Sequence, residues 1–226
     1  MGYSALIYFE MESNRMKKEN LKQKAYCFIK SKIINCEYLP NTFLNESILM
    51  EEINTSRTPI REALNKLEQE NLVTIMPKKG VVVGELSINE VNMIFQVRDS
   101  IEPYIIRTCG ANIDKNALKL MRDKILNNIE QEEIEKFYQI DDAFHRFLIS
   151  SSGNKYFHQT MDCIYNQIHR MRVLSGKKID ERLKQTQEEH LTIIALLLED
   201  KVEESAEAMQ KHLQNSKNAT LMSLMI

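Results

Sequence analysis

The hydrophobic pattern of the chain changes from a helical period to a strand period near residue 72, and this change constrains the fold most strongly. Before it, residues 58–70 place four apolar side chains on one helical face: Ile60, Ala63, Leu64 and Leu67. After it, two short β-branched runs, residues 72–76 and 81–83, flank the sequence Pro-Lys-Lys-Gly. The pattern predicts a helix followed by a β-hairpin with a basic turn.

Two further helices are expected before this one. Apolar residues at helical spacing predict the first over residues 21–33, and Pro40 prevents its continuation. Residues 47–53 predict a short second helix, which the polar residues 54–56 separate from the third. Pro59 suits the first turn of the third helix, because its missing N–H would have no helical partner. Three helices and a basic hairpin in this order predict a winged helix-turn-helix.

The remainder of the chain carries helical patterns alone. Ser87 and Glu90 form a capping box at the start of a helix that reaches about residue 108. Further helices are predicted over residues 115–128, 132–151, 155–174, 180–199 and 201–216. We therefore expect a mainly α protein with an N-terminal extension (residues 1–17), a winged helix-turn-helix domain (18–85) and an all-helical bundle of about six or seven helices (86–226).

Composition and charge narrow the class of protein. The longest apolar stretch, residues 193–198, is far shorter than the roughly 20 residues of a membrane span, and no leader pattern opens the chain. Four cysteines without a CxxC pair favour reduced thiols, so we expect a cytoplasmic protein with no membrane partner. Residues 15–80 carry 12 Lys and Arg against 8 Asp and Glu, whereas residues 81–226 carry 18 against 22. A polyanion would therefore meet the N-terminal part.

The start of the third helix carries two arginines four residues apart, Arg57 and Arg61. Recognition helices contact DNA bases through their N-terminal residues, and the arginine fork matches guanine O6 and N7. We expect these two residues to recognise bases. Contacts to phosphates or the flanking groove are expected from hydroxyls and hairpin lysines: Thr55, Ser56, Thr58, Lys78 and Lys79. The alternative is that both arginines are solvated and pair with Glu62 or other neighbours.

Residues 18–85 resemble the GntR family of bacterial transcription regulators. The resemblance rests on the run from Ser56 to Leu64 (SRTPIREAL), on Leu67-Glu68 and on Gly80 at the wing, while Asn41 and Asn71 stand where the family usually has glycines. It implies a transcription regulator, most often a repressor, and not an enzyme. Because one recognition helix covers only a few base pairs, we expect a homodimer on a palindromic double-stranded operator.

The helical part places four potential metal ligands on apolar faces. Asp141 and His145 lie one turn apart on the helix of residues 132–151, and His190 and His212 replace core residues on the last two helices. A buried carboxylate needs a partner, and a divalent ion accepts neutral imidazoles as well. The alternative is hydrogen-bonded core histidines without a metal. The two remaining histidines are expected at the surface: His158 and His169.

A second resemblance, to the helical FCD ligand-binding domain of the FadR-like branch, covers roughly residues 87–216. It is carried by Arg98 to Glu102, Asp141 to His145, Glu189-His190 and Ala206 to Leu213. In metal-containing members an Asp and three His hold a divalent ion, which implies Asp141, His145, His190 and His212 as ligands here. This ligand set favours zinc, with nickel or manganese also compatible.

Arg98 is the only charged residue in an apolar stripe of its helix, and a buried guanidinium needs an anion. That anion is either a small carboxylate effector, held jointly by Arg98 and the metal, or Glu102 one turn away. Arg172 is a second candidate for effector binding, while Arg170 is expected in solvent. Our prediction is an effector-controlled transcription regulator.

Two other functions remain open from the residues alone. A metal-dependent hydrolase would use the same ligands, but it lacks an obvious general base, since Glu189 points about 100° around the helix from His190. Alternatively, the metal of a regulator is purely structural or is itself the signal.

Overall fold

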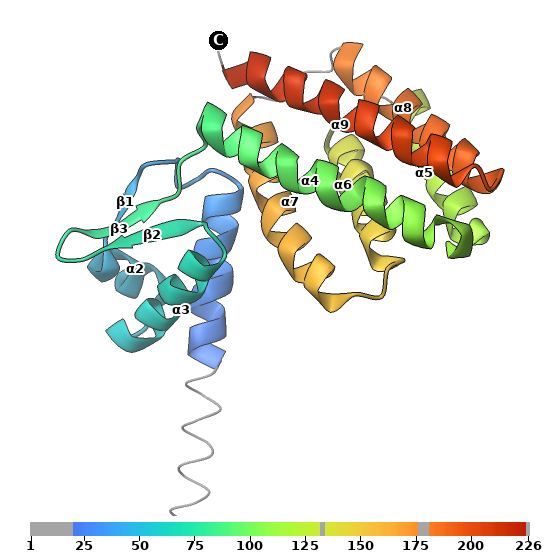
Figure 1. Ribbon diagram of the computed structural model, residues 1–226. Helices are drawn as coiled ribbons and strands as arrows, with labels where there is room; N and C mark the ends of the chain where they lie inside the picture. Colours follow the sequence, from blue (N-terminus) through green and yellow to red (C-terminus); the bar gives the residue numbers. More distant parts are fainter. Residues whose placement is uncertain (1–19, 132–133, 176–180, 225–226) are drawn as a thin grey trace, which may run out of the picture. The chain divides into compact units, whose positions relative to one another are not determined.

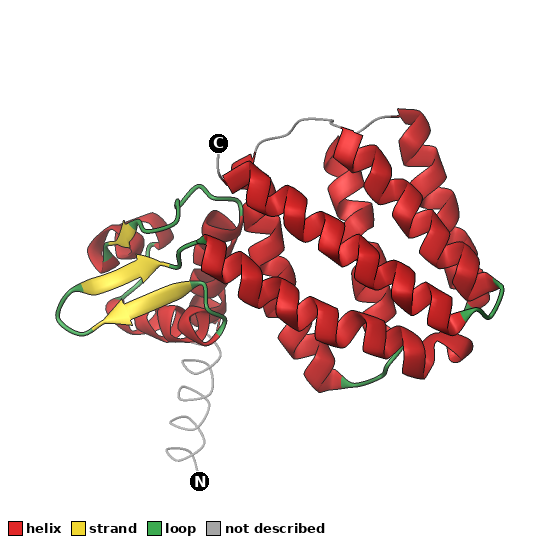
Figure 2. Cartoon of the chain, turned by 45° about the horizontal axis from the view of Figure 1, so that its top comes forward, coloured by secondary structure: helices red, strands yellow, loops and turns green. Residues whose placement is uncertain are grey.

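The computed structural model describes residues 20–131, 134–175 and 181–224, and the chain divides into two compact units, Met1–Glu85 and Leu86–Ile226. The first unit is a winged helix-turn-helix (Figures 1 and 2). Residues 20–34 are helical, and α2 (Glu46–Ile53) and α3 (Arg57–Gln69) follow. The hairpin consists of β2 (Val73–Met76) and β3 (Gly80–Val83).

The first strand, β1 (Phe43–Leu44), is not predicted by the sequence pattern. It pairs antiparallel with β3, so that the sheet order is β1-β3-β2. A strand of two residues is too short for an alternating pattern to predict, and its partner lies almost 40 positions further along the sequence. The three-stranded sheet nevertheless agrees with the predicted winged fold.

The apolar stripes predicted for the first three helices form the core of this unit. Ile29, Ile53, Leu64 and Leu67 are almost fully buried there, together with strand residues such as Val83. Since each stripe faces the same core, the two helices of the helix-turn-helix are held at a defined angle. The exposed face of α3 does not contribute to this core.

Asparagines provide the left-handed backbone that the turns of this unit need. Asn54 (φ 54°) ends α2, and Asn41 (φ 64°) and Asn71 (φ 57°) hold the same conformation at the positions where the GntR family usually has glycine. Asparagine adopts this region more readily than other non-glycine residues. The departures from the family pattern therefore keep the turn geometry.

The second unit consists of helices (Figure 2). They are α4 (Ile88–Cys109), a short 3-10 turn (Gly110–Asn112), α5 (Lys115–Gln131), α6 (Ile134–Ser150), α7 (Lys155–Ser175), α8 (Glu181–Leu198) and α9 (Val202–Leu224). Ser87 caps α4 by accepting the Glu90 N–H at 3.2 Å, as the capping box predicts. The last helix extends eight residues beyond its predicted end.

Helices α4 and α9 lie side by side, with α8 packed against α9 (Figure 1). Their apolar faces enclose a core that includes Ile106, Phe144, Ile194, Met209 and Leu213. Several charged side chains are buried beside this core rather than at the surface. None of the described helices combines the length and apolar character needed to cross a membrane.

Candidate DNA-contacting helix and metal centre

Arg57 and Arg61 lie in the first two turns of α3, and both side chains are exposed, by 58% and 62%. Each guanidinium contacts the carboxylate of Glu46 at the start of α2. Arg61 Nε lies 3.1 Å from both Glu46 oxygens, and Arg57 Nε lies 3.4 Å from Oε2. The expected alternative partner, Glu62, instead pairs with Lys22 at 3.6 Å. The Glu46 contacts use Nε, so they do not occupy the terminal nitrogens of either arginine.

The predicted phosphate contacts divide into two groups. Ser56 and Thr58 are exposed at the N-terminus of α3, and the Ser56 side chain makes no capping hydrogen bond. Lys78 and Lys79 are exposed at the hairpin turn, where Lys78 has a φ of 63°. The Thr55 hydroxyl, by contrast, is buried and has no hydrogen-bond partner among the described residues. A buried oxygen does not reach a phosphate in this conformation, so the described geometry supports the other four residues as phosphate contacts and does not support Thr55.

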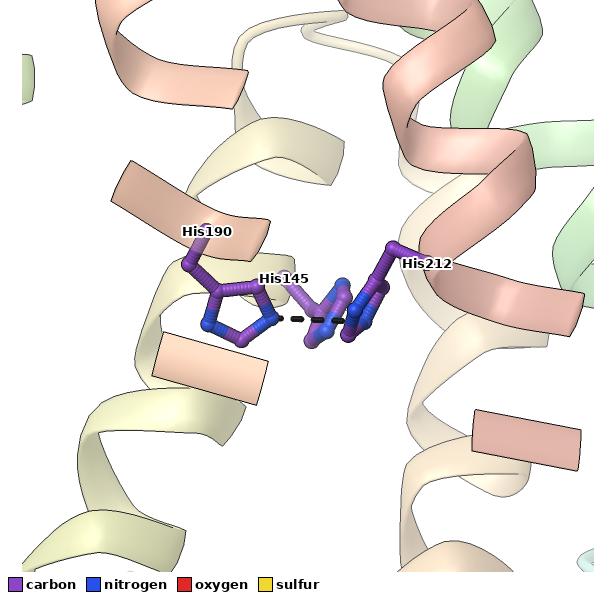
Figure 3. Close-up of side chains that lie close together, drawn as sticks. All are labelled: His145, His190 and His212. Atoms are coloured by element: carbon purple, nitrogen blue, oxygen red, sulfur yellow. Dashed lines mark hydrogen bonds between the residues drawn. The ribbon is translucent and has the colours of Figure 1, made fainter. Parts of the chain in front are cut away.

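Three imidazoles from three helices converge inside the second unit: His145 of α6, His190 of α8 and His212 of α9 (Figure 3). Each is at most 2% exposed, and one ring nitrogen of each lies within 4.8 Å of the others. His190 Nε2 and His212 Nε2 are 3.3 Å apart. Two ligand atoms about 2.1 Å from a zinc ion, at the tetrahedral angle, are about 3.4 Å apart.

Asp141 lies at the same point. Its Oδ1 is 3.7 Å from His190 Nε2 and 4.0 Å from His145 Nε2, while its Oδ2 accepts a hydrogen bond from Arg172. The three imidazoles form the compact ligand group, and Asp141 adds one oxygen beside two of them. The donor set suits a divalent transition metal.

Burial sets the protonation of these groups. It lowers the pKa of His190 well below its usual value, and it lowers that of His212 to about 4 despite the hydrogen bond with Glu189. Burial alone would raise the pKa of Asp141, but the positive charge of Arg172 brings it below the ordinary value. Near neutral pH both histidines are therefore uncharged and the aspartate is ionised, which are the forms that bind metal.

Two glutamates that sequence reasoning did not assign to the site complete this centre. Glu102 Oε2 lies 2.7 Å from His145 Nδ1, and Glu189 Oε2 lies 2.7 Å from His212 Nδ1. Burial raises the pKa of each glutamate, but for Glu102 the charge of Arg98 and for Glu189 the hydrogen bond of His212 outweigh it, so that both values fall to about 2. Glu189 points away from His190 on its own helix, as its spacing predicts, and reaches His212 on α9 instead.

The arginines predicted to bind an effector are each bonded to a carboxylate of the chain. Arg98 is 2% exposed, and its Nε donates to Glu102 Oε1 at 2.7 Å, which is the internal pair weighed above. Arg172 contacts Asp141, and its Nη1 lies 3.3 Å from Asp142 Oδ1.

The prediction for Arg170 was wrong. This side chain is fully buried instead of solvated, and its Nη1 donates to Gln167 at 2.6 Å. The two histidines expected at the surface, His158 and His169, are only partly exposed. All three lie on α7, whose contacts with neighbouring helices the periodicity of one helix does not reveal.

A cavity of about 420 Å³ is lined by three of the four potential ligands, Asp141, His145 and His212. Its walls come from α4, α6, α7, α8 and α9, and its polar lining includes Arg98, Asp141, His145, Arg172, Arg182 and His212. This volume is in the range of small-molecule sites. The centre is therefore reachable by a ligand of metabolite size.

A winged helix-turn-helix joined in one chain to a helical domain with a ligand-sized cavity defines a class of protein, the two-domain regulators of transcription. Residues 21–83 match the bacterial regulatory proteins of the gntR family, and residues 93–215 match the FCD domain. The FCD match alone spans more than half of the chain. This chain belongs to the GntR family and carries an FCD domain, so it is a DNA-binding transcription regulator and not an enzyme.

Individual relatives agree with this assignment. The chain is 25% identical over 197 residues to the HTH-type transcriptional repressor RspR of Escherichia coli K12, covering 86% of each sequence. The solved structure of McbR/YncC from E. coli has the same fold, with a TM-score of 0.73 at 17% identity over 89% of this chain and 97% of that one. The Zn²⁺-bound FCD domain of TM0439 matches 62% of this chain and 98% of its own, with a TM-score of 0.54 and 21% identity.

Proposed function

We propose that this regulator holds a divalent metal ion at Asp141, His145, His190 and His212, and that a small organic anion bound beside it changes the affinity for the operator. The convergence of these buried ligand atoms next to the cavity carries the proposal. The Zn²⁺ in the FCD domain of TM0439 supports zinc, with nickel or manganese as alternatives. The anion would weaken operator binding and the operator would weaken anion binding by the same factor, which corresponds to a coupling free energy of about 1–3 kcal/mol.

The charge balance of the cavity makes the anion dependent on the metal. Each lining arginine is bonded to a carboxylate: Arg98 to Glu102, Arg172 to Asp141 and Asp142, and Arg182 to Glu189. When the imidazoles are neutral, these three arginines and their four carboxylate partners carry three positive and four negative charges. The bound ion supplies two positive charges and an open coordination position. Without it, the cavity has no net attraction for an anion.

We expect a screen of small carboxylic acids to raise the melting temperature of the zinc-loaded protein and not that of the chelator-treated protein. An acid at 100 times its Kd adds about 2.7 kcal/mol, which corresponds to roughly 5–10 °C for a chain of this length. The neutral amides of the same acids are the control and should give no shift. An equal shift with and without zinc would assign the anion to the arginines alone. If no acid shifts the zinc-loaded protein, a structural or signalling metal is favoured.

For operator binding we propose that Arg57 and Arg61 recognise bases from the N-terminal turns of α3, with Glu46 restraining both through Nε. Ser56, Thr58, Lys78 and Lys79 would contact phosphates or the flanking groove. A two-fold dimer on a palindromic operator supplies enough contacted bases for specificity. The name of RspR supports a repressor. We propose that it acts in the cytoplasm, where a bacterial operator lies.

Removing both wing lysines should weaken the salt dependence of operator binding. Each phosphate contact adds about 0.9 to the slope of log K against log salt, so K78A combined with K79A should lower the slope by about 2 per protomer. The measurement is fluorescence anisotropy over a salt series. The matched control is K119A with K124A, two exposed lysines of α5, which should leave the slope unchanged. An unchanged slope in the wing variant would contradict the proposed wing contacts.

A further inference from the structure

Two of the three converging imidazoles receive the same support on the ring nitrogen that faces away from the centre. Glu102 on α4 meets Nδ1 of His145 on α6, and Glu189 on α8 meets Nδ1 of His212 on α9. Both nitrogen–oxygen distances are 2.7 Å. In each case the carboxylate and the imidazole come from different helices, so the contact depends on the packing of the bundle.

Each glutamate is in turn held by an arginine of its own helix. Arg98 Nε donates to Glu102 Oε1 at 2.7 Å, and Arg98 Nη2 lies 3.3 Å from both ring nitrogens of His145. The Glu102 carboxylate, at 2.7 Å, makes the shorter contact with Nδ1. Arg182 grips Glu189 with two hydrogen bonds, of 2.8 and 2.7 Å. The result is two hydrogen-bonded Arg–Glu–His triads whose imidazoles meet at the candidate metal centre.

Such a triad decides which ring nitrogen of the histidine is available to bind a metal. A neutral imidazole carries its proton on one of two nitrogens, and a carboxylate at Nδ1 retains the proton there. The lone pair of Nε2 then faces the centre, and the ring is held in orientation. His190 differs, because no carboxylate of a described residue contacts its Nδ1, and its ring packs on Phe144 with centroids 4.5 Å apart.

We infer that Glu102 and Glu189 are positioning residues that set the metal affinity of this centre by holding His145 and His212 in the Nδ1-protonated form. The inference rests on the proposed metal function and extends it to residues outside the ligand set. The inference includes the two arginines, since each one restrains the glutamate that in turn restrains a histidine ligand. Arg98 and Arg182 are thereby assigned to the centre rather than to an effector.

The test measures the zinc dissociation constant of the full chain by competition with a chromophoric chelator. We expect E189A to weaken zinc binding by about 10–100-fold, and E189Q, which keeps an acceptor oxygen, to recover part of the loss. The matched control is E188A, which removes the adjacent exposed glutamate of the same helix and should match the wild type. E102Q tests the Arg98–Glu102–His145 triad in the same way.

A second readout separates positioning from a purely structural role. The visible absorption of bound Co²⁺ reports ligand geometry, and it should change in E189A while the circular dichroism spectrum of the metal-free protein does not. If the wild type binds zinc and E189A binds it within about twofold of E188A, the positioning role is overturned. If the wild type itself binds no zinc, the proposed metal function fails. Glu102 is fully buried, so the result for E102Q is used only if that variant folds. If it does not fold, the Glu189 variants alone test the inference.

Discussion

Replacing His190 and His212 together by alanine is expected to abolish metal binding. The two Nε2 atoms lie 3.3 Å apart and supply half of the proposed ligands, and Asp141 and His145 alone make a weak site. The wild type, loaded with zinc and dialysed, should retain one equivalent per chain, whereas H190A/H212A should retain none. Elemental analysis of the two proteins measures the difference directly. A double variant that still carries one equivalent would show that other residues hold the metal.

Two further variants guard against loss of the fold. Both imidazoles are buried, so the double alanine variant leaves a cavity of its own. D141N changes a single atom of the proposed ligand set and should also reduce the retained metal while conserving volume. H158A with H169A removes two imidazoles of α7 that lie outside the ligand set, and this variant should retain the wild-type equivalent.

Replacing Arg61 by alanine is expected to remove most of the preference for the operator over random DNA. A bidentate arginine–guanine contact discriminates by about 1–3 kcal/mol, and a two-fold dimer loses it twice, so the preference should fall by roughly 30-fold to 10⁴-fold. The operator can be selected from random duplexes with the wild-type protein. Affinity for the selected site and for an unrelated duplex, measured at one salt concentration, then gives the ratio for each variant.

The control for Arg61 is a partly exposed arginine of the other unit. R122A removes a side chain that, like Arg61, is paired with an acidic neighbour, here Asp123 at 3.1 Å. It should keep the preference of the wild type, because no DNA contact is assigned to α5. If R61A discriminates between the two duplexes as well as R122A does, Arg61 is not the base-contacting residue proposed above.

Local patterns predicted most of the secondary structure correctly. Helices were found because their apolar residues repeat every three or four positions, and the hairpin was found because β-branched runs flank a Pro-Gly turn. The failures concern features without such a local repeat. Strand β1 has two residues, and its existence depends on pairing with β3.

The site shows the same division. The spacing of Asp141 and His145 predicts that they share a helical face, and the positions of His190 and His212 in apolar stripes predict that they are buried. The stripes and the resemblance to the FCD domain also predict that the three rings point toward a common interior. How closely they meet depends on how α6, α8 and α9 pack, and the structure gives that distance.

The sequence by itself therefore determined the winged fold, the all-helical second domain and the residue types of the candidate sites, because each of these depends on contacts between near neighbours in the chain. The tertiary structure alone decided the partners of the buried charges. Arg172 satisfies its charge with Asp141, Glu102 reaches His145, and Glu189 reaches His212, each on another helix. The free energy of a buried charge depends on which opposite charge lies within a few ångströms, and helices far apart in sequence supply that charge.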